Sequence, residues 1–365
     1  MALSDLVRAA ENRFHRDTIP VLKRRGWRPR AIAYTGYGST SKARVMARMV
    51  LRPEGVPADG PLFRSLPEQL PASMHQAADI AAQRIAEAQR GWRSFVDAPV
   101  PYLPVTVRVG EATLRTRADR DGYIDLVVPE HHLPPGLHEV EVQATGSAPV
   151  TGSVLIVPPG PRLGVVCDID DTVVVSHVPR MLVAAYNQLV KYSSAREPVP
   201  GMAEMLSRVG THHAGSPVIY LSTGAWNVVP TMRSFLQRHG FPLGPMLMTD
   251  WGPTNTGWFR SGIEHKRTQL RRLMLDLPEV RWLLVGDDGQ HDPLIYGEVA
   301  RDHAERVSAV AIRRLTTGQK LLAGTMSLEP EVHLLGQCPV PVVFGADGSE
   351  LAERLPHEVT DPAGS

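Results

Sequence analysis

The chain has 365 residues and a mass of 40.0 kDa, which excludes one small domain and fits two or three domains of roughly 150 residues each. Hydrophobic residues make up 43% and charged residues 21%, the values of an ordinary globular protein, so wholesale disorder is excluded. The 39 basic and 38 acidic residues leave a net charge of +1, which argues against a whole-chain binder of polyanions.

Charge is distributed unevenly near the start of the chain. No Asp or Glu occurs between Thr18 and Pro53, and this basic block carries nine cations: Lys23, Arg24, Arg25, Arg28, Arg30, Lys42, Arg44, Arg48 and Arg52. Such a block favours an anionic partner, either a phosphate-bearing lipid or a nucleic acid. A solvated basic face is the alternative interpretation.

The cellular compartment is indicated by the cysteines and the apolar runs. The two cysteines, Cys167 and Cys338, are too few for a disulfide framework, and Cys167 lies in an apolar run typical of a reduced core thiol. No N-terminal stretch has the apolar region of a signal sequence, and no window of about 18 apolar residues predicts a transmembrane helix. We therefore expect a cytoplasmic protein, with peripheral contact at the inner face of the membrane as the variant that the basic block favours.

The first half of the chain is predicted to be rich in strands. Residues 1–30 have apolar side chains at helical spacing and are expected to form an N-terminal helical segment. Residues 31–157 alternate with period two between turn residues, which predicts an all-β, sandwich-like domain. Its first two strands are expected at Ala31–Tyr37 and Ala43–Arg52. A helical pattern at about 66–92 indicates an insertion in this domain.

The run Pro158-Pro159-Gly160-Pro161 marks a domain boundary because it is too stiff to continue a strand. From 160 to 335, apolar runs alternate with amphipathic helical patterns, among them a helix from Pro179 to Lys191. This alternation predicts an α/β domain with a Rossmann-like parallel sheet covered on both faces, in which ligands bind at the carboxyl ends of the strands. Residues 336–365 are expected to form a C-terminal extension with one further apolar run, Val340–Gly345.

The strongest chemical signal follows the apolar run Leu163–Cys167. Three carboxylates come directly after it, at Asp168, Asp170 and Asp171. They would repel one another at the end of a buried strand unless a cation offset their charge, so a metal site is indicated. An acidic loop that binds calcium is the alternative, although the glycine and glutamate of an EF-hand are missing.

Two further segments place hydroxyls and an ammonium near such an edge. Ser222 and Thr223 follow the predicted strand Val218–Leu221 and precede a helix, where backbone N–H groups can hold an anion. Lys266 lies at the start of another predicted helix, the end at which the helix dipole disfavours a cation unless an anion is near. Taken singly, these residues read as helix caps and a solvated lysine.

The predicted strand Trp282–Val285 again runs into carboxylates, at Asp287, Asp288 and Asp292. An Asp-Gly turn explains Asp288 alone, but two acidic strand ends in one parallel sheet are harder to dismiss. Brought to one edge of the sheet, the carboxylates, hydroxyls and ammonium are the groups that metal-assisted phosphoryl transfer requires.

The sequence resembles the haloacid dehalogenase phosphatase superfamily. Its four motifs are matched in order by DxDxT at Asp168, Asp170 and Thr172, by Ser222, by Lys266, and by GDxxxxD from Gly286 to Asp292. Over roughly residues 160–315 the chain is similar to the catalytic domain of actin-patch-type phosphatidate phosphatases and their bacterial relatives, which are distantly related to lipins. The motifs that carry this similarity are DIDDT, PGM, LSTGAWN, DWG, FRSG, HK and GDDGQHDPLIY. One departure is Asp171, which stands where the superfamily has glycine.

The resemblance implies a Mg²⁺-dependent phosphatase. Asp168 would be the nucleophile that forms an aspartyl-phosphate, and Asp170 the general acid and base. The residues implied to bind the phosphate, with Thr172 also orienting Asp170, are Thr172, Ser222, Thr223 and Lys266. Those implied to bind the metal are Asp168, Asp170 through its backbone carbonyl, Asp287 and Asp292. Oxygen ligands suit Mg²⁺, and the lack of a Cys/His cluster argues against zinc.

Three functions are compatible with these residues. The first is hydrolysis of phosphatidate to diacylglycerol and phosphate at a membrane surface, and the second is hydrolysis of a soluble or macromolecular phosphomonoester. The third is binding of anionic lipid without turnover, which the presence of Asp168 disfavours. We expect a phosphomonoester substrate of phospholipid type, because the segment between the first two motifs is too short for a full globular cap and a weakly capped site admits a large substrate. No nucleic-acid partner is expected.

Overall fold

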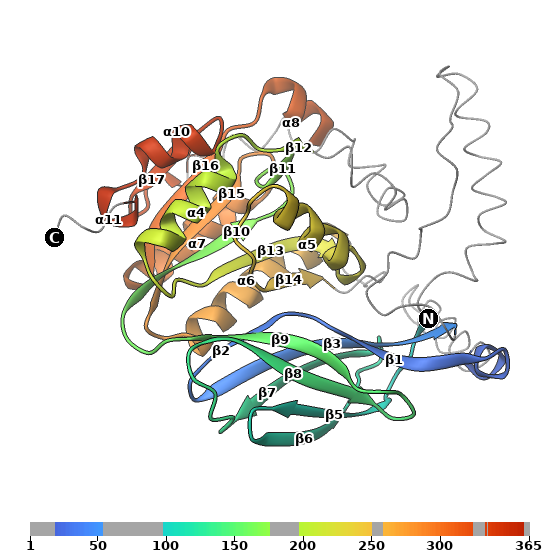
Figure 1. The fold of residues 1–365 in the computed structure, drawn as a ribbon. Helices are drawn as coiled ribbons and strands as arrows, with labels where there is room; N and C mark the ends of the chain where they lie inside the picture. Colours follow the sequence, from blue (N-terminus) through green and yellow to red (C-terminus); the bar gives the residue numbers. More distant parts are fainter. Residues whose placement is uncertain are drawn as a thin grey trace, which may run out of the picture.

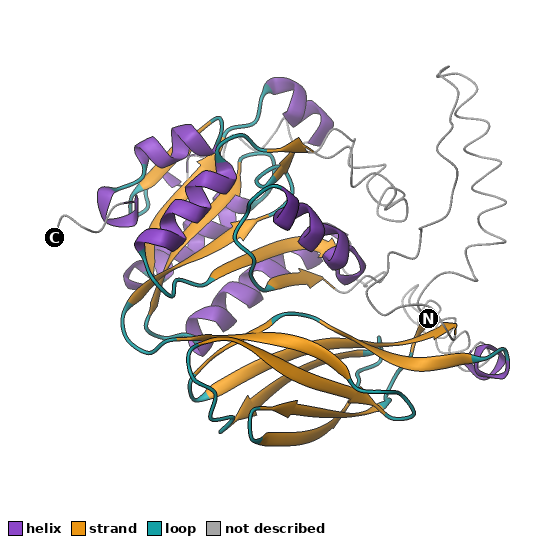
Figure 2. Ribbon diagram, in the orientation of Figure 1, coloured by secondary structure: helices purple, strands orange, loops and turns teal. Residues whose placement is uncertain are grey.

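The computed structural model describes residues 19–53, 98–175, 197–249, 258–323, 333 and 335–360. The helical insertion expected at about 66–92, the helix expected from Pro179 to Lys191 and most of the N-terminal helical segment lie outside these residues. The described chain forms a β-rich part (residues 27–157) and an α/β part (residues 162–360), which lie one against the other in Figure 2.

The β-rich part consists of one nine-stranded sheet. Its strands are β1 (Trp27–Ala33), β2 (Gly36–Ser39), β3 (Lys42–Pro53), β4 (Ala98–Pro99), β5 (Pro104–Val109), β6 (Ala112–Arg117), β7 (Tyr123–Pro129), β8 (Gly136–Ala144) and β9 (Val150–Val157). Their order is β1-β3-β2-β9-β8-β5-β6, with β4 and β7 also paired to β3. All pairs are antiparallel except β2 with β9. The first strand expected from the sequence, Ala31–Tyr37, is in fact divided between β1 and β2.

Alternating burial explains why these segments form half-buried strands. In β5, Val105, Val107 and Val109 are buried whereas Thr106 and Arg108 point away from the core. Most buried residues of the sheet form one hydrophobic cluster, to which β1, β3, β5 and β8 contribute, whereas Tyr37, Met46, Tyr123 and Val157 belong to the cluster of the α/β part. The sheet therefore has its own core.

The α/β part has the expected parallel sheet. Its six strands, in the order β14-β13-β10-β15-β16-β17, are β14 (Met246–Thr249), β13 (Val218–Ala225), β10 (Arg162–Asp168), β15 (Val280–Asp287), β16 (Val307–Arg313) and β17 (Val342–Gly345). Every neighbouring pair is parallel. β10 and β15, which precede the two acidic clusters, are neighbours inside the sheet, so their carboxyl ends meet at one edge.

Helices cover this sheet on both sides (Figure 1). They are α4 (Met202–His212), α5 (Val229–Arg238), α6 (Trp258–Asp276), α7 (Asp292–Asp302), α8 (Thr317–Ala323), α10 (Gly348–Arg354) and α11 (His357–Thr360). α6 contacts α7, whereas α4 contacts α10 and α11. Two short strands, β11 (Val174–Val175) and β12 (Glu197–Pro198), pair with each other beside the sheet. The apolar run that we placed in a C-terminal extension supplies β17, an edge strand of the parallel sheet.

Asp276, the last residue of α6, joins the two parts. It accepts hydrogen bonds from Tyr37 Oη (3.1 Å), Lys42 Nζ (2.8 Å) and Arg44 Nη1 (3.0 Å). Arg44 also forms a two-pronged ion pair with Asp125, with distances of 2.5 and 2.7 Å. The expectation that the basic block serves an external anion is therefore wrong for Lys42 and Arg44, whose anionic partners lie in the same chain.

A second contact between the parts is aromatic. Trp226 begins a 3₁₀ turn (Trp226–Val228) directly after β13, and its side chain is buried. Its ring lies 4.4 Å from that of Tyr34 and 6.4 Å from that of Tyr123, centroid to centroid. Both tyrosines belong to the main hydrophobic cluster of the α/β part, so the two parts share buried apolar surface. Among the described residues, no helix has the length and hydropathy needed to cross a bilayer.

Candidate active site

β10 brings Asp168 to the edge of the parallel sheet. The strand is buried along almost its whole length between β13 and β15, so the position of its last residue is fixed from both sides. After Asp168 the chain turns tightly, because the carbonyl of Ile169 accepts hydrogen bonds from the backbone N–H groups of Thr172, Val173 and Val174. Asp168 is 1% exposed.

β15 and α7 supply the second acidic group. Asp287 ends β15 and Asp292 begins α7, and both side chains are fully buried. Asp292 packs over Gly286, where a Cβ would overlap the Asp292 carboxylate and lie 2.8 Å from Tyr296 Cε2. The glycine of the GDxxxxD motif is therefore needed for space rather than for an unusual backbone angle.

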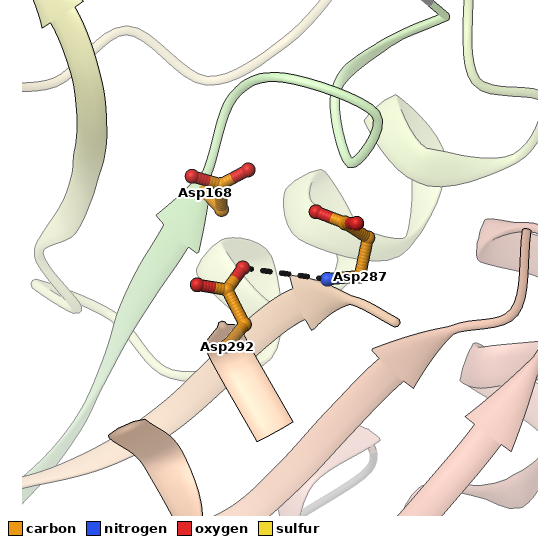
Figure 3. A group of neighbouring side chains, drawn as sticks. All are labelled: Asp168, Asp287 and Asp292. Atoms are coloured by element: carbon orange, nitrogen blue, oxygen red, sulfur yellow. Dashed lines mark hydrogen bonds between the residues drawn. The ribbon is translucent and has the colours of Figure 1, made fainter. Parts of the chain in front are cut away.

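The two acidic strand ends meet, as the sequence predicts. One carboxylate oxygen from each of Asp168, Asp287 and Asp292 lies within 4.8 Å of the other two. Figure 3 shows the three side chains pointing into a common space. Within the described part of the chain, Asp168 Oδ2 and Asp287 Oδ2 are buried and accept no hydrogen bond. Two unpaired buried carboxylate oxygens beside a third carboxylate are well suited to a hard divalent cation.

Lys266, from α6, supplies positive charge to this cluster. Its Nζ lies 2.6 Å from Asp168 Oδ1 and 2.5 Å from Asp292 Oδ1, and its side chain is 2% exposed. Burial alone would lower the pKa of this amine, but the two carboxylates outweigh burial and raise the pKa, so Lys266 is an ammonium at neutral pH. One ammonium faces three carboxylates, which leaves an excess of negative charge.

Burial and this negative charge together change the pKa values of the carboxyl groups. Burial raises the pKa of Asp168 well above its usual range, with Lys266 offsetting only part of the effect. Burial, followed by the charge of Asp292, does the same to the pKa of Asp287. A divalent cation would reverse both shifts because it stabilises the ionised carboxylates.

Asp170, in the turn after β10, faces Ser222 rather than the three-carboxylate cluster. Ser222 Oγ donates to Asp170 Oδ2 at 3.2 Å and accepts from the N–H of Gly224 at 2.9 Å. Asp170 is half-buried, so one of its sides is open to a ligand. The hydroxyl of Thr172 is buried and makes no hydrogen bond to any described residue, so Ser222 orients Asp170 here and Thr172 does not. Thr223 is exposed next to Ser222.

Two residues that we did not predict hold successive carbonyls of this turn. Gln290 Nε2 donates to the carbonyl of Asp170 at 3.3 Å, and Arg313 Nη1 donates to the carbonyl of Asp171 at 2.6 Å. Asp171 has φ of 59°, the left-handed conformation that glycine and, less readily, aspartate adopt. This conformation explains why aspartate can stand where the superfamily has glycine. Gln290 lies within the GDDGQHD motif and could have been found there.

Arg313 ends β16 and gives no comparable signal in the sequence. It is 5% exposed, and its Nε also donates to the carbonyl of Ala346 at 3.1 Å. Burial lowers its pKa, an effect that the charges of Asp171 and Asp287 partly oppose. Arg313 is thus a second buried cation next to the acidic cluster, on the β16 side.

Asp288 has a structural partner. Its Oδ1 accepts from the N–H of Leu315 at 2.8 Å, and its Oδ2 lies 2.7 Å from Lys320 Nζ. The side chain therefore anchors the segment that follows β16, and both of its oxygens are engaged there.

The fold and the site define a class, a parallel α/β domain with a cluster of buried carboxylates at the carboxyl edge of its sheet. Residues 163–314, less than half of the chain, match the family model described as "Phosphatidate phosphatase APP1, catalytic domain". The match assigns this segment to a family of phosphatases, a class of hydrolase.

Other comparisons add little. No curated protein matches the chain. A carbohydrate acetylesterase from Xanthomonas citri is similar at 11% identity with a TM-score of 0.27, over 74% of this chain and 71% of that one. A β-glucuronidase from Parabacteroides merdae is similar at 8% identity with a TM-score of 0.24, over 79% of this chain and 34% of that one. At such TM-scores neither similarity carries an argument about fold or function.

Proposed function

We propose that the protein is a Mg²⁺-dependent phosphatase of the haloacid dehalogenase type and that its substrate is phosphatidate, which it converts to diacylglycerol and phosphate. The observation that carries the proposal is the environment of Asp168: one oxygen is held by Lys266 at 2.6 Å, and the other is buried without a hydrogen bond among the described residues. A carboxylate so placed is oriented and poorly solvated, which favours its action as a nucleophile.

In the proposed reaction an Asp168 oxygen attacks phosphorus, and the bond from phosphorus to the leaving oxygen breaks with its electron pair on that oxygen. Asp170 gives its proton to the leaving oxygen, which releases the alcohol and leaves an aspartyl-phosphate on Asp168. Asp170 then takes a proton from water as the water oxygen attacks phosphorus, so that phosphate leaves and Asp168 is restored. Ser222 orients Asp170 for both proton transfers.

Mg²⁺ would be held by carboxylate oxygens of Asp168, Asp287 and Asp292, together with the backbone carbonyl of Asp170. When bound, it would neutralise charge on the phosphoryl oxygens and on the surrounding carboxylates. Lys266, already oriented by Asp168 and Asp292, would donate to a phosphoryl oxygen as charge builds there, and the exposed Thr223 next to Ser222 would contact the same group.

The location and domain boundaries are part of the same proposal. We place the protein in the cytoplasm with peripheral contact at the membrane. The β-rich domain would extend from 31 to 157 and the catalytic domain from 160 to 335, and the pairing of β17 with β16 supports counting the last segment, 336–365, with the catalytic domain.

A generic aryl phosphate tests for catalysis. We expect Mg²⁺-dependent hydrolysis by the wild type and a loss of at least ~1000-fold in Asp168→Asn, because the nucleophile is removed. Asp302→Asn is the matched control, since Asp302 is exposed at the far end of α7 and should leave turnover unchanged. Full turnover in Asp168→Asn would refute the mechanism, and lipid binding without hydrolysis would indicate a binding module.

The substrate requires a separate comparison. Phosphate release from phosphatidate in mixed micelles is measured against soluble phosphomonoesters at the same salt concentration. We expect a higher kcat/KM for phosphatidate. A higher value for a soluble phosphomonoester would leave the mechanism in place and reject the lipid substrate.

A further inference from the structure

We propose that an exposed basic surface at the start of the β-rich part docks the protein on an anionic lipid bilayer. This surface, the basic tip, consists of Lys23, Arg24, Arg25, Arg28 and Arg30. The inference rests on the proposed function in one respect, namely that the substrate lies in a bilayer that the protein has to reach.

The cations of the basic block differ in whether they contact a partner within the chain. Lys42 and Arg44 form ion pairs with Asp276, and Arg48 lies over the ring of Tyr123 at 4.8 Å. In the basic tip, by contrast, four of the five side chains are exposed and Arg30 is half-buried. Across the described ranges, none of the five pairs with a carboxylate. Their charge is therefore available to an external anion.

The basic tip is built on an ordered turn. Residues 19–24 are helical, and the N–H of Arg25 donates to the carbonyls of Val21 and Leu22 at 3.1 and 3.0 Å. Gly26, with φ of 84°, ends the helix, and the buried Trp27 follows it. Leu22 in the helix packs against the core of the β-rich part, and the buried Trp27 follows the turn. The turn is therefore attached to the sheet by a residue on each side of it.

The side chains of the basic tip are directed away from the core. Arg28 and Arg30 alternate along β1 with the buried Trp27 and Ala31, so they share the face of the strand opposite to these two residues. Val21 is 44% exposed in the helical turn that carries Lys23. An exposed apolar side chain among cations is the combination found in segments that lie at a bilayer interface.

The basic tip is on the same side of the molecule as the edge of the parallel sheet that carries the site. Figure 1 shows β1 starting on the side toward which β13 and β14 point. β13 carries Ser222 close to its carboxyl end. A bilayer that contacts the basic tip would therefore face the edge at which the phosphate is proposed to bind.

Sedimentation with lipid vesicles tests the proposal. The vesicles contain phosphatidylcholine alone or with phosphatidylglycerol, which is anionic but carries no phosphomonoester, so binding is measured without turnover. The tip variant is Lys23→Gln/Arg24→Gln/Arg25→Gln/Arg28→Gln. The control changes four exposed arginines elsewhere by the same charge: Arg115→Gln/Arg208→Gln/Arg238→Gln/Arg271→Gln.

We expect the wild type and the control to bind phosphatidylglycerol vesicles and not phosphatidylcholine vesicles. The tip variant should lose ~100-fold in partition coefficient, and added salt should weaken wild-type binding. Equal binding by the tip variant and the wild type would overturn the proposal, as would equal binding of the wild type to neutral vesicles. Binding of the basic tip to single-stranded RNA but not to vesicles would also overturn it.

Hydrolysis of a soluble aryl phosphate separates this proposal from the proposed function. The tip variant should keep wild-type turnover on that substrate, because none of the changed residues lies at the site. If neither protein hydrolyses the aryl phosphate but the vesicle results hold, the phosphatase proposal fails and the docking surface stands.

Discussion

Replacing Lys266 with methionine shows how much the free energy of unfolding decreases when the acidic cluster loses its ammonium. The ammonium contacts Asp168 at 2.6 Å and Asp292 at 2.5 Å, and all three side chains are at most 2% exposed. Without it, two buried carboxylates lose their cation while the volume at the site is nearly unchanged. Breaking a buried ion pair from one side typically costs about 3–5 kcal/mol, so we expect that loss in the free energy of unfolding of the metal-free protein at pH 8.

The loss should depend on pH. In Lys266→Met the pKa of Asp168, already raised by burial, rises further in the folded state, while the unfolded value stays near about 3.9. Between those two values the folded protein binds more protons than the unfolded chain, so the stability of the variant falls as pH rises through this window. The destabilisation should therefore be smaller at pH 5 than at pH 8.

Urea unfolding followed by circular dichroism, with EDTA present, measures both effects. Lys42→Met serves as the control, because Lys42 pairs with Asp276 but is 35% exposed and should contribute at most about 1 kcal/mol. A Lys266→Met protein as stable as the wild type at pH 8 would refute the account, and so would a destabilisation that does not change between pH 5 and pH 8.

Gly286→Ala should lower the affinity for Mg²⁺ and cost about 1–3 kcal/mol of stability, because its Cβ displaces the Asp292 carboxylate; titration calorimetry with MgCl₂ measures this, and wild-type affinity would contradict it. Arg313→Lys cannot hold the carbonyls of Asp171 and Ala346 with two separate N–H groups and should reduce Mg²⁺ affinity or kcat by about 10–100-fold, whereas unchanged values would assign Arg313 to packing alone. Burial lowers the pKa of His265 to about 4, so the free energy of unfolding should decrease as pH falls from about 6.5 toward 4. His265 accounts for at most ~3 kcal/mol of this decrease, and its contribution should be absent in His265→Leu.

Much of the site followed from the rule that parallel strands present their carboxyl ends at one edge. The apolar runs before Asp168 and Asp287 predicted buried strands, and two such strands in one sheet had to bring these carboxylates near each other. This inference needed only local pattern and sheet geometry. The helix start that we expected at Lys266 was wrong, because α6 begins at Trp258 and Lys266 lies well inside it. The lysine nevertheless reaches the acidic cluster.

Other features depend on contacts between distant segments, which a single sequence does not report. Arg44 and Asp276 are separated by 232 positions, and nothing local distinguishes Arg44 from Arg28, which has no carboxylate partner in the described part of the chain. Arg313 reaches a carbonyl 142 positions earlier. The apolar run before Gly345 is short enough to read as an appendage, and only its pairing with β16 makes it part of the sheet.

Helix α6 carries Lys266 and ends at Asp276, ten residues and about 15 Å farther along its axis. Lys266 lies near the middle of the helix and is held by Asp168 and Asp292. Asp276, at the end of the helix, is held by Tyr37, Lys42 and Arg44. Because a helix is stiff over this length, a shift at one of the two points displaces the other. A substitution on the surface of the β-rich part can therefore displace the Lys266 ammonium, so the β-rich part helps to position the residues of the site.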